Sequence, residues 1–277
     1  PASIRKLITP RTKAIVAVDF TGQAVELDEI REICKEHDLI LIEDAAHAIG
    51  TKYKGQPVGS LADMTCFSFH PVKTVTGGEG GAITTNDEKL YRHLMRLRTH
   101  GITRDPAEMV HPTDALWYNE QVELGFNYRM TDFQAALLLS QLKKLPAFEQ
   151  RRKEIHKRYN EAFGKMPELI LQKEIPESDT TWHLYVLHLN LENLNCDRRQ
   201  FFDALYAENT CPQVHYLPVY WHSYYEKLGY QKGLCPSAEK YYNEVMSIPL
   251  YYGLTDDDVE DVIHAVKKVV AYYTKLK

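Results

Sequence analysis

The sequence predicts an α/β fold in which a large domain with a mostly parallel sheet precedes a small α+β domain. Two observations predict the large domain: segments typical of strands and of helices alternate over the first half, and the early strands are unbroken apolar runs. The length of 277 residues exceeds the size at which one core keeps growing, which predicts the second domain. We expect a boundary between residues 145 and 165, giving domains of residues 1–150 and 151–277.

The first elements form a strand–helix–strand unit. Residues 13–20 (KAIVAVDF) are an apolar run of the kind that is buried on both faces of a sheet. Residues 21–38 give a turn and an amphipathic helix, and residues 39–46 (LILIEDAA) are a second apolar run. A right-handed crossover through the helix makes the two strands parallel.

Two shorter strands follow, at residues 64–70 and 81–86. The segment between them holds Lys73 and the glycine-rich run TGGEGG. Residues 87–101 predict a helix, because acidic residues stand in the first turn, basic residues in the last, and Gly101 ends it. Lys73 is therefore expected in a turn between two strands.

The middle of the chain is expected to be irregular and then helical. Residues 102–128 form an excursion of more than ~20 residues, and ordered loops of that length are usually functional. Thr131 and Asp132 offer caps for a long helical pattern. Pro146 should kink or divide that helix, because proline lacks the N–H donor and clashes with the preceding turn.

The smaller domain is predicted from four segments. Residues 182–190 and 212–220 are expected to be strands, and residues 197–209 a helix. The last helix begins at Thr255, which forms a capping box with Asp258. These elements describe an α+β arrangement.

Composition excludes several classes of protein. The net charge of −5 gives no indication of a polyanion partner and argues against nucleic acid. The five cysteines are scattered and form no CxxC pair, which argues against a disulfide framework and a zinc ribbon and favours the reduced cytoplasm. No apolar run has the length needed to span a membrane, and the start lacks the pattern of a signal peptide. We expect a cytoplasmic protein.

Lys73 is the residue from which the functional prediction starts. A lysine beside glycines can be a solvated surface charge, a phosphate ligand in a P-loop, or an amine that forms a Schiff base. A P-loop places the lysine after the glycines, whereas Lys73 precedes them. A Schiff base needs a partly desolvated lysine, because burial lowers the pKa and makes the neutral amine available.

Asp44 is the candidate partner of this lysine. It ends the second apolar strand, and the carboxyl end of a parallel strand points into the crevice where open α/β sheets bind ligands. A lysine that works with pyridoxal phosphate needs such a carboxylate, which keeps the pyridine nitrogen protonated. The alternative for Asp44 is the cap of a following helix.

The sequence around this pair resembles one protein family. The stretch IEDAAHAIGTKYKGQPVGSLADMTCFSFHPVKTVTGGEGGAITTND is similar to the signature of the DegT-type nucleotide-sugar aminotransferases. The similarity continues through GFNYRMTDFQAALLLSQL to VHYLPVY and so covers nearly the whole chain. It implies the fold of PLP-dependent transferases of type I, as in aspartate aminotransferase, with pyridoxal 5′-phosphate as the cofactor.

The resemblance implies roles for five residues. Lys73 resembles the lysine that holds the cofactor as a Schiff base and then moves a proton, and Asp44 resembles the partner of the pyridine nitrogen. His47 stands where the family has Gln or His near the cofactor ring, and Ser68 resembles a phosphate ligand. Asn127 resembles an asparagine that reaches the cofactor phosphate of the neighbouring subunit, which implies a homodimer with shared active sites. The alternative for His47 is a packed histidine, and the alternative for Asn127 is an asparagine chosen for a turn.

The resemblance extends to a substrate. The segments RLRTHGITRD and WYNEQVELGFNYRMTDFQAAL look most like the family's members in the pseudaminic acid pathway, which aminate C4 of a UDP-linked 4-keto-6-deoxy-N-acetylhexosamine with L-glutamate. An aminotransferase of another keto nucleotide sugar is the alternative. Residues expected to contact the nucleotide sugar, through bidentate donors or stacking faces, are His100, Arg104, Tyr128, Arg129, His215 and Tyr216. Core packing is the alternative for the tyrosines.

Other enzyme classes fit less well. Dehydratases of the family have a histidine in place of the lysine, and Lys73 argues against them. Cysteine desulfurases need a reactive cysteine in a mobile loop, and no cysteine here lies in a Gly/Ser-rich loop with basic neighbours. A metal hydrolase is the rival from another class, but the 12 histidines form no HExxH or paired-ligand spacing, so we expect no metal.

The start of the sequence carries one more expectation. The chain opens on PASIRKLITP, without an initiator methionine and a few residues before a buried-type strand. The resemblance implies a preceding segment with a loop that binds the cofactor phosphate. We therefore expect the sequence to be part of a longer polypeptide. The alternative is a catalytically incomplete chain that only binds a partner, or binds the cofactor weakly.

Overall fold

The computed structural model describes residues 1–111 and 113–275. These residues group into two compact units. The first contains Pro1–Phe20 and Ala24–Leu145, and the second contains Thr21–Gln23 and the chain from Pro146 onward. The functional division into domains 1–150 and 151–277 stays a prediction.

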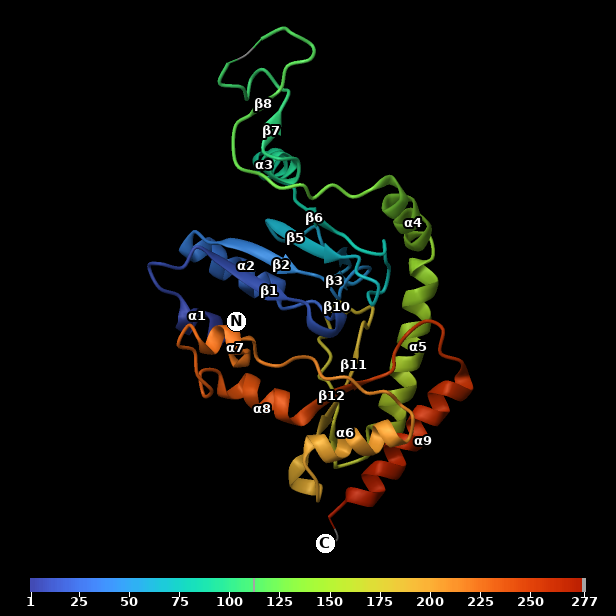
Figure 1. The fold of residues 1–277 in the computed structure, drawn as a ribbon. Coiled ribbons are helices and arrows are strands. Elements are labelled where there is room, and N and C mark those ends of the chain that lie inside the picture. Colours follow the sequence, from blue (N-terminus) through green and yellow to red (C-terminus); the bar gives the residue numbers. More distant parts are fainter. Residues whose placement is uncertain (112, 276–277) are drawn as a thin grey trace. The chain divides into compact units, whose positions relative to one another are not determined.

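The first unit is built on a four-stranded sheet with the order β1-β2-β5-β6 (Figure 1). Strands β1, β2 and β5 are parallel, whereas β6 runs antiparallel to β5. Its elements are α1 (Ala2–Leu7), β1 (Ala14–Val18), α2 (Leu27–His37), β2 (Ile40–Asp44), β3 (Lys52–Tyr53), β4 (Gln56–Pro57), β5 (Met64–Ser68), β6 (Gly81–Thr84), α3 (Glu88–Arg98), β7 (Ile102–Thr103), β8 (Glu120–Gln121) and α4 (Asp132–Leu142). The predicted parallel strand–helix–strand unit is confirmed.

The two faces of this sheet differ. Helix α2 buries Leu27 and Ile30 in a cluster with Leu41 of β2, which covers one face. On the opposite face Val16 and Ile40 are 61% and 42% exposed. The apolar runs predicted burial on both faces, and this prediction is wrong within the described residues, because the chain supplies a covering helix on one face only.

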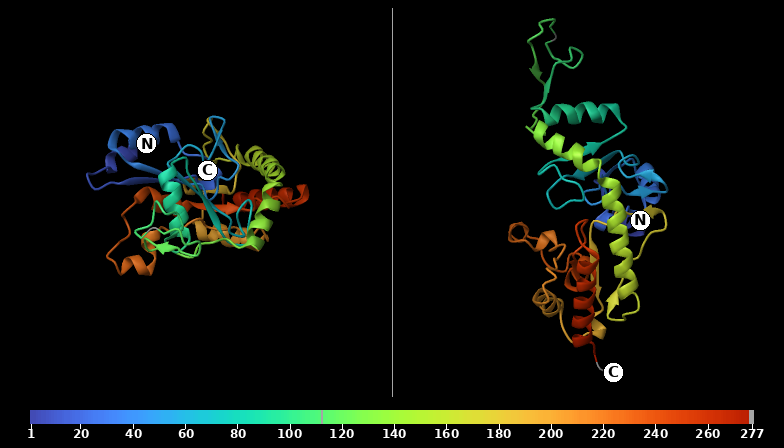
Figure 2. Two further views of the ribbon diagram at one scale, coloured as in Figure 1. Left: turned by 90° about the horizontal axis from the view of Figure 1, so that it is seen from above. Right: turned by 90° about the vertical axis from the view of Figure 1, so that its right-hand side faces the viewer.

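An arm extends from this sheet. Asp87 caps α3 by accepting hydrogen bonds from the N–H groups of Lys89 and Leu90, and α3 leads into the hairpin of β7 and β8. Figure 1 and the right-hand view of Figure 2 show the hairpin beyond α3, on the side away from the β1-β2-β5-β6 sheet. The hairpin lies within the long excursion predicted as irregular, in which residue 112 is outside the described residues.

The second unit packs helices on a three-stranded antiparallel sheet with the order β12-β11-β9. Its principal elements are α5 (Leu145–Phe163), β9 (Leu169–Ile170), β10 (Ser178–Asp179), β11 (Tyr185–Leu189), α6 (Arg198–Ala207), α7 (Ser223–Glu226), α8 (Pro236–Glu244), β12 (Val245–Ile248) and α9 (Asp256–Tyr273). Side chains of α5, α9 and the sheet, among them Tyr159, Phe163, Leu187 and Val266, form one core.

The helix ends predicted at Thr255 and Pro146 are confirmed. Thr255 and Asp258 form the predicted capping box at the start of α9. Pro146 divides the long helical pattern, because α4 ends at Leu142 and α5 begins at Leu145. Among the described residues, no helix is both long and apolar enough to cross a membrane.

The predicted strand at residues 212–220 is wrong. This segment makes one isolated bridge, between Gln213 and Ser247, and then a 3-10 turn at Val219–Trp221. Pro212 and Pro218 lack the N–H that a ladder needs, which explains the failure. The strand beside β11 is β12 instead, and all four of its residues are buried.

Candidate active site

Asp44 lies at the carboxyl end of β2, and backbone hydrogen bonds fix its position. Its carbonyl oxygen accepts from Asp19 N at 3.0 Å, and Ala45 N donates to Cys66 O at 2.9 Å. Hydrogen bonds therefore join this end of β2 to the segments of β1 and β5 on either side of it. The half-buried side chain of Asp44 accepts from Ala46 N at 3.1 Å through Oδ1. Asp44 therefore lies at the edge of the sheet where parallel α/β proteins bind ligands.

Lys73 lies in the folded segment that joins β5 to β6. Its N–H donates to His70 O at 3.0 Å, and Gly77 N donates to Phe69 O at 3.0 Å, which closes the segment into a compact turn. Burial lowers the pKa of Lys73, and the negative charge of Asp44 opposes this effect. The structure therefore provides a partly desolvated amine within the electrostatic reach of a carboxylate.

The glycine run after Lys73 shapes this turn. Gly78 and Gly80 have φ values of 84° and 131°, in the region that favours glycine. Gly81 begins β6, and a Cβ added there would lie 2.7 Å from Phe67 O. The close pairing of β5 and β6 behind Lys73 therefore requires glycine at that position.

His47 and Ser68 lie near the same edge of the sheet. His47 follows β2 by three residues, is 8% exposed, and its ring centroid is 5.8 Å from that of Phe20. Ser68 ends β5, which pairs with β2, and its Oγ accepts from His70 N at 3.4 Å. These groups suit a cofactor with three features. The amine of Lys73 can bind an aldehyde, the carboxylate of Asp44 can bind a basic ring nitrogen, and the hydroxyl of Ser68 can bind a phosphate.

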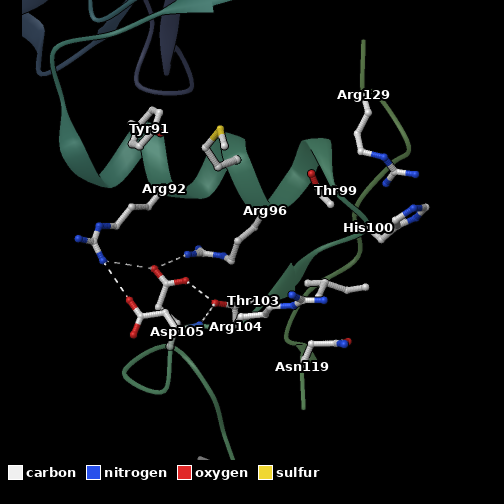
Figure 3. Close-up of a pocket in the computed structure, with 13 residues that line it drawn as sticks. Tyr91, Arg92, Arg96, Thr99, His100, Thr103, Arg104, Asp105, Asn119 and Arg129 are labelled. Carbon is white, nitrogen blue, oxygen red and sulfur yellow. Dashed lines mark hydrogen bonds and ion pairs between the residues drawn. The ribbon is translucent and has the colours of Figure 1, made fainter. Parts of the chain in front are cut away.

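A separate cavity of about 750 Å³ lies on the arm, between α3 and the hairpin of β7 and β8. Its lining includes His100, Arg104 and Arg129, three of the six residues predicted to contact a nucleotide sugar (Figure 3). Asp44 and Lys73 do not line it. The structure therefore brings these three residues together, in a pocket that does not include the lysine.

The charges of this cavity fall into two groups. Arg96 is paired with Glu108 at 3.0 Å and with Glu123 at 2.6 Å, and Arg92 is paired with Glu88 at 2.8 Å. Arg104 and Arg129 form no ion pair with the residues that the structure describes. Figure 3 shows Arg92 and Arg96 linked to acidic side chains, with His100 and Arg129 at the other end of the pocket. That end is left cationic.

The segment that carries Asn127, Tyr128 and Arg129 is fixed against the end of α3. His100 N donates to Phe126 O at 2.8 Å, and Tyr128 N donates to Arg98 O at 3.0 Å. The ring of Tyr128 stacks on that of Phe126 at 4.8 Å. Asn127 is exposed and forms a bridge with Thr99, so its side chain is accessible on the arm surface.

The remaining two candidates, His215 and Tyr216, belong to the second unit. His215 Nδ1 lies 2.9 Å from Ser247 Oγ of β12, and the rings of His215 and Tyr216 are 4.6 Å apart. Their role in binding a nucleotide sugar stays a prediction.

Sequence reasoning missed two groups of residues. Glu108 and Glu123 hold the arginines of the arm cavity, and only the fold brings them together. Asp19 and Glu43 are fully buried carboxyls beside Asp44. A carboxylate inside each apolar run, in VDF and in IED, is the sequence signal for the second group.

Comparison with known proteins places most of the chain in one family. Residues 1–267 match the model of the DegT/DnrJ/EryC1/StrS aminotransferase family. The spore coat polysaccharide biosynthesis protein SpsC of Bacillus subtilis is 41% identical over 98% of this chain and 70% of its own length. The UDP-4-amino-4,6-dideoxy-N-acetyl-beta-L-altrosamine transaminase of Helicobacter pylori is 33% identical over 96% of this chain and 68% of its own length.

Solved structures show the same fold. Helicobacter pylori PseC, an aminotransferase involved in the biosynthesis of pseudoaminic acid, superposes with a TM-score of 0.89 at 32% identity, covering 98% of this chain and 70% of that chain. Spr1654 from Streptococcus pneumoniae in its PLP form superposes with a TM-score of 0.86 at 29% identity, covering 97% of this chain and 71% of that chain. The predicted fold of PLP-dependent aminotransferases is confirmed.

Proposed function

We propose that this chain, which belongs to the DegT/DnrJ/EryC1/StrS aminotransferase family, transfers an amino group from L-glutamate to the C4 keto group of a UDP-linked 4-keto-6-deoxy-N-acetylhexosamine. The observation that carries the proposal is the half-buried Lys73, whose ammonium is within the electrostatic reach of Asp44. Such a reaction serves the synthesis of a bacterial surface sugar of the pseudaminic acid type.

Pyridoxal phosphate is the cofactor of the family, and when bound it supplies an electron sink for the carbon that gains or loses the amino group. Lys73 would hold the cofactor covalently and then, as a free amine, move a proton to or from that carbon. The lowered pKa of Lys73 favours this second role, because a general base must be neutral before it accepts a proton.

The neighbouring residues would hold the cofactor in place. Asp44 would keep the ring nitrogen protonated through its carboxylate, since a nearby anion stabilises the positive charge. Ser68 would donate its hydroxyl to the phosphate, and His47 would lie near the ring. Asn127 would reach the phosphate bound by a second copy of the chain.

The cationic end of the arm cavity supports a nucleotide-sugar substrate. Arg104 and Arg129 present guanidinium groups whose paired donors match a diphosphate, and His100 lies beside them. We assign His215 and Tyr216, with Tyr128, to the remainder of the nucleotide sugar. The relatives named as UDP-4-amino-4,6-dideoxy-N-acetyl-beta-L-altrosamine transaminases, at 33% and 37% identity, favour this substrate class.

A homodimer is part of the proposal. The arm exposes Leu116, Trp117 and Leu124 by 96%, 83% and 83%, and α4 exposes Phe133 by 91%. Apolar patches of this kind mark interfaces. An interface between copies at the arm would carry Asn127 and Arg129 to a partner's cofactor site. The free cysteines suit a reducing compartment, and we place the enzyme in the cytoplasm.

A second candidate is an aminotransferase of another keto nucleotide sugar. SpsC, at 41% identity against 33% for the Helicobacter pylori transaminase, is named for spore coat polysaccharide biosynthesis, and this different end product favours the second candidate. The test is to incubate the purified protein with pyridoxal phosphate, L-glutamate and a panel of keto nucleotide sugars, and to identify the product by NMR. A 4-amino product from the UDP-linked N-acetylhexosamine supports the first substrate. A product from another keto sugar alone supports the second, and no amino sugar at all contradicts both.

A further inference from the structure

Two carboxyl groups lie fully buried beside Asp44, where the reaction described above gives them no role. Asp19 follows β1 and Glu43 is the residue of β2 that precedes Asp44, and both side chains are 0% exposed. Because successive residues of a strand point to opposite faces, Glu43 points to the face covered by α2 when Asp44 points away from it. Burying an ionised carboxylate is costly unless the charge is compensated.

Hydrogen bonds satisfy two of the four carboxyl oxygens of Asp19 and Glu43. Asp19 Oδ1 accepts from Val25 N at 3.0 Å. Glu43 Oε2 accepts from Thr65 Oγ1 at 2.8 Å and from Gly59 N at 3.4 Å. The other two oxygens, Asp19 Oδ2 and Glu43 Oε1, are buried and receive no donor from the residues that the structure describes.

The leading charges that act on Asp19 are negative. They come from Glu43 and, more weakly, from Asp44. Burial, followed by the charge of Glu43, raises the pKa of Asp19 to about 8, and burial raises the pKa of Glu43. Two buried anions repel each other, whereas one proton between them removes a charge and supplies the missing donor.

We propose that Asp19 and Glu43 share one proton, carried by Asp19 and donated to Glu43, and that this hydrogen bond positions Asp44. The backbone supports the positioning role, because Asp19 N also donates to Asp44 O at 3.0 Å. Asp19 is thus joined to β2 twice, through its backbone to Asp44 and through its side chain to Glu43. Loss of the proton would set two anions against each other at the strand end that carries Asp44.

The positioning role rests on the proposed function, whereas the shared proton does not. With the proton in place, the pair and Asp44 carry two negative charges instead of three. A third negative charge would repel the other two and destabilise the strand end that holds Asp44. Asp19 and Glu43 therefore act as positioning residues through Asp44.

The first experiment detects the proton in the protein without cofactor. Infrared difference spectra between pH 6.5 and 9.5 should show the C=O band of a buried carboxylic acid, which is lost with a midpoint near pH 8. Asp19→Asn should abolish the band. Glu43→Gln should lower the midpoint, because it removes the charge of Glu43 that adds to burial in raising the pKa of Asp19. Asp28→Asn, an exposed acid paired with Lys54, is the control and should retain the band.

The outcomes separate a shared proton from its alternatives. No carboxylic acid band in the unmodified protein overturns the proposal, and so does a band that persists in Asp19→Asn. A band that survives in Glu43→Gln with an unchanged midpoint shows a proton held by Asp19 alone and also overturns sharing. If one variant fails to fold, the other and the unmodified protein still decide the question.

Stability gives a second readout. The pKa of Asp19 in the folded chain exceeds its unfolded value, so the folded state binds more protons between about pH 4 and pH 8 and its stability falls as pH rises through this window. Asp19→Asn mimics the protonated side chain, so this loss should disappear in urea titrations of the variant. An equal loss in both proteins contradicts the proposal.

The positioning role is tested by the pH profile of transamination. A group of pKa about 8 is protonated in roughly one molecule of eleven at pH 9, so kcat should fall about tenfold from its acidic plateau in the unmodified enzyme. Asp19→Asn should reduce this fall to less than about threefold at a similar KM. An identical alkaline limb in the variant overturns the positioning role. Absence of all transamination would instead contradict the proposed function, and the infrared result would stand.

Discussion

The charge of Asp44 raises the pKa of Lys73, while burial of the lysine lowers it, with burial the larger effect. The two residues come from different elements, Asp44 from the end of β2 and Lys73 from the turn between β5 and β6. The parallel pairing of β2 with β5 brings them to one edge of the sheet. Burial therefore favours the neutral amine of Lys73 beside the carboxylate of Asp44, the pair of groups that a PLP-dependent aminotransferase requires.

Replacement of Asp44 by asparagine should separate cofactor binding from catalysis. The amide keeps the shape of the side chain but cannot hold the ring nitrogen protonated, so we expect kcat to fall by about 10²- to 10³-fold or more. Covalent attachment of the cofactor at Lys73 should persist. Steady-state kinetics and the absorption spectrum of the variant measure the two effects, and unchanged kcat would remove Asp44 from the mechanism.

Arg104 should affect the sugar substrate and not the amino donor. Its guanidinium forms no ion pair among the described residues and lines the cationic end of the arm cavity. Arg104→Gln should raise KM for the nucleotide sugar by about 10-fold or more, the cost of one charge-assisted hydrogen bond pair. KM for L-glutamate should stay the same.

The control for this prediction is Arg199→Gln. Arg199 is exposed on α6, and its ion pair among the described residues is with Asp203, so neither KM should change. An equal effect of Arg104→Gln on both substrates would contradict a diphosphate site at this position.

Gly125 should be required for the arm. A Cβ added there would overlap the backbone nitrogen of Gly101. The close contact of these two backbone segments fixes the residues from Asn127 to Arg129. Gly125→Ala should open the arm, which limited proteolysis would detect as faster cleavage between residues 100 and 130. Gly55→Ala is the control, because its added Cβ meets nothing within 4 Å, although its φ of 79° costs about 1 kcal/mol. Equal protection of both variants would show that the arm tolerates the Cβ.

The sequence predicted best what depends on neighbouring residues. The apolar runs around Val16 and Ile42, the cap of Thr255 and the break at Pro146 are local signals, and each appears in the structure where it was expected. Asp44 and Lys73 were singled out from local signals too, because Asp44 ends one recognisable strand and Lys73 lies in the turn after another, and their catalytic roles stay predictions.

What depends on distant pairing was not predictable. Strand β12 has four residues and is defined by its ladder with β11, more than fifty residues earlier, so its sequence VMSI gives no periodic signal. The ion pair of Arg96 with Glu123 joins residues 27 positions apart in the sequence, and the buried pair of Asp19 and Glu43 depends on the register of β1 with β2. Only the fold shows that these groups meet.

Reduction of the cofactor-loaded protein with borohydride tests the central claim most directly. The protein, loaded with pyridoxal phosphate, is reduced and digested, and the peptides are analysed by mass spectrometry, with Lys73→Ala and Lys54→Ala treated in parallel. We predict one reduced cofactor on the peptide that contains Lys73, the same result in Lys54→Ala, and neither attached cofactor nor transamination in Lys73→Ala. Attachment at another lysine, or transamination that survives in Lys73→Ala, would contradict the account.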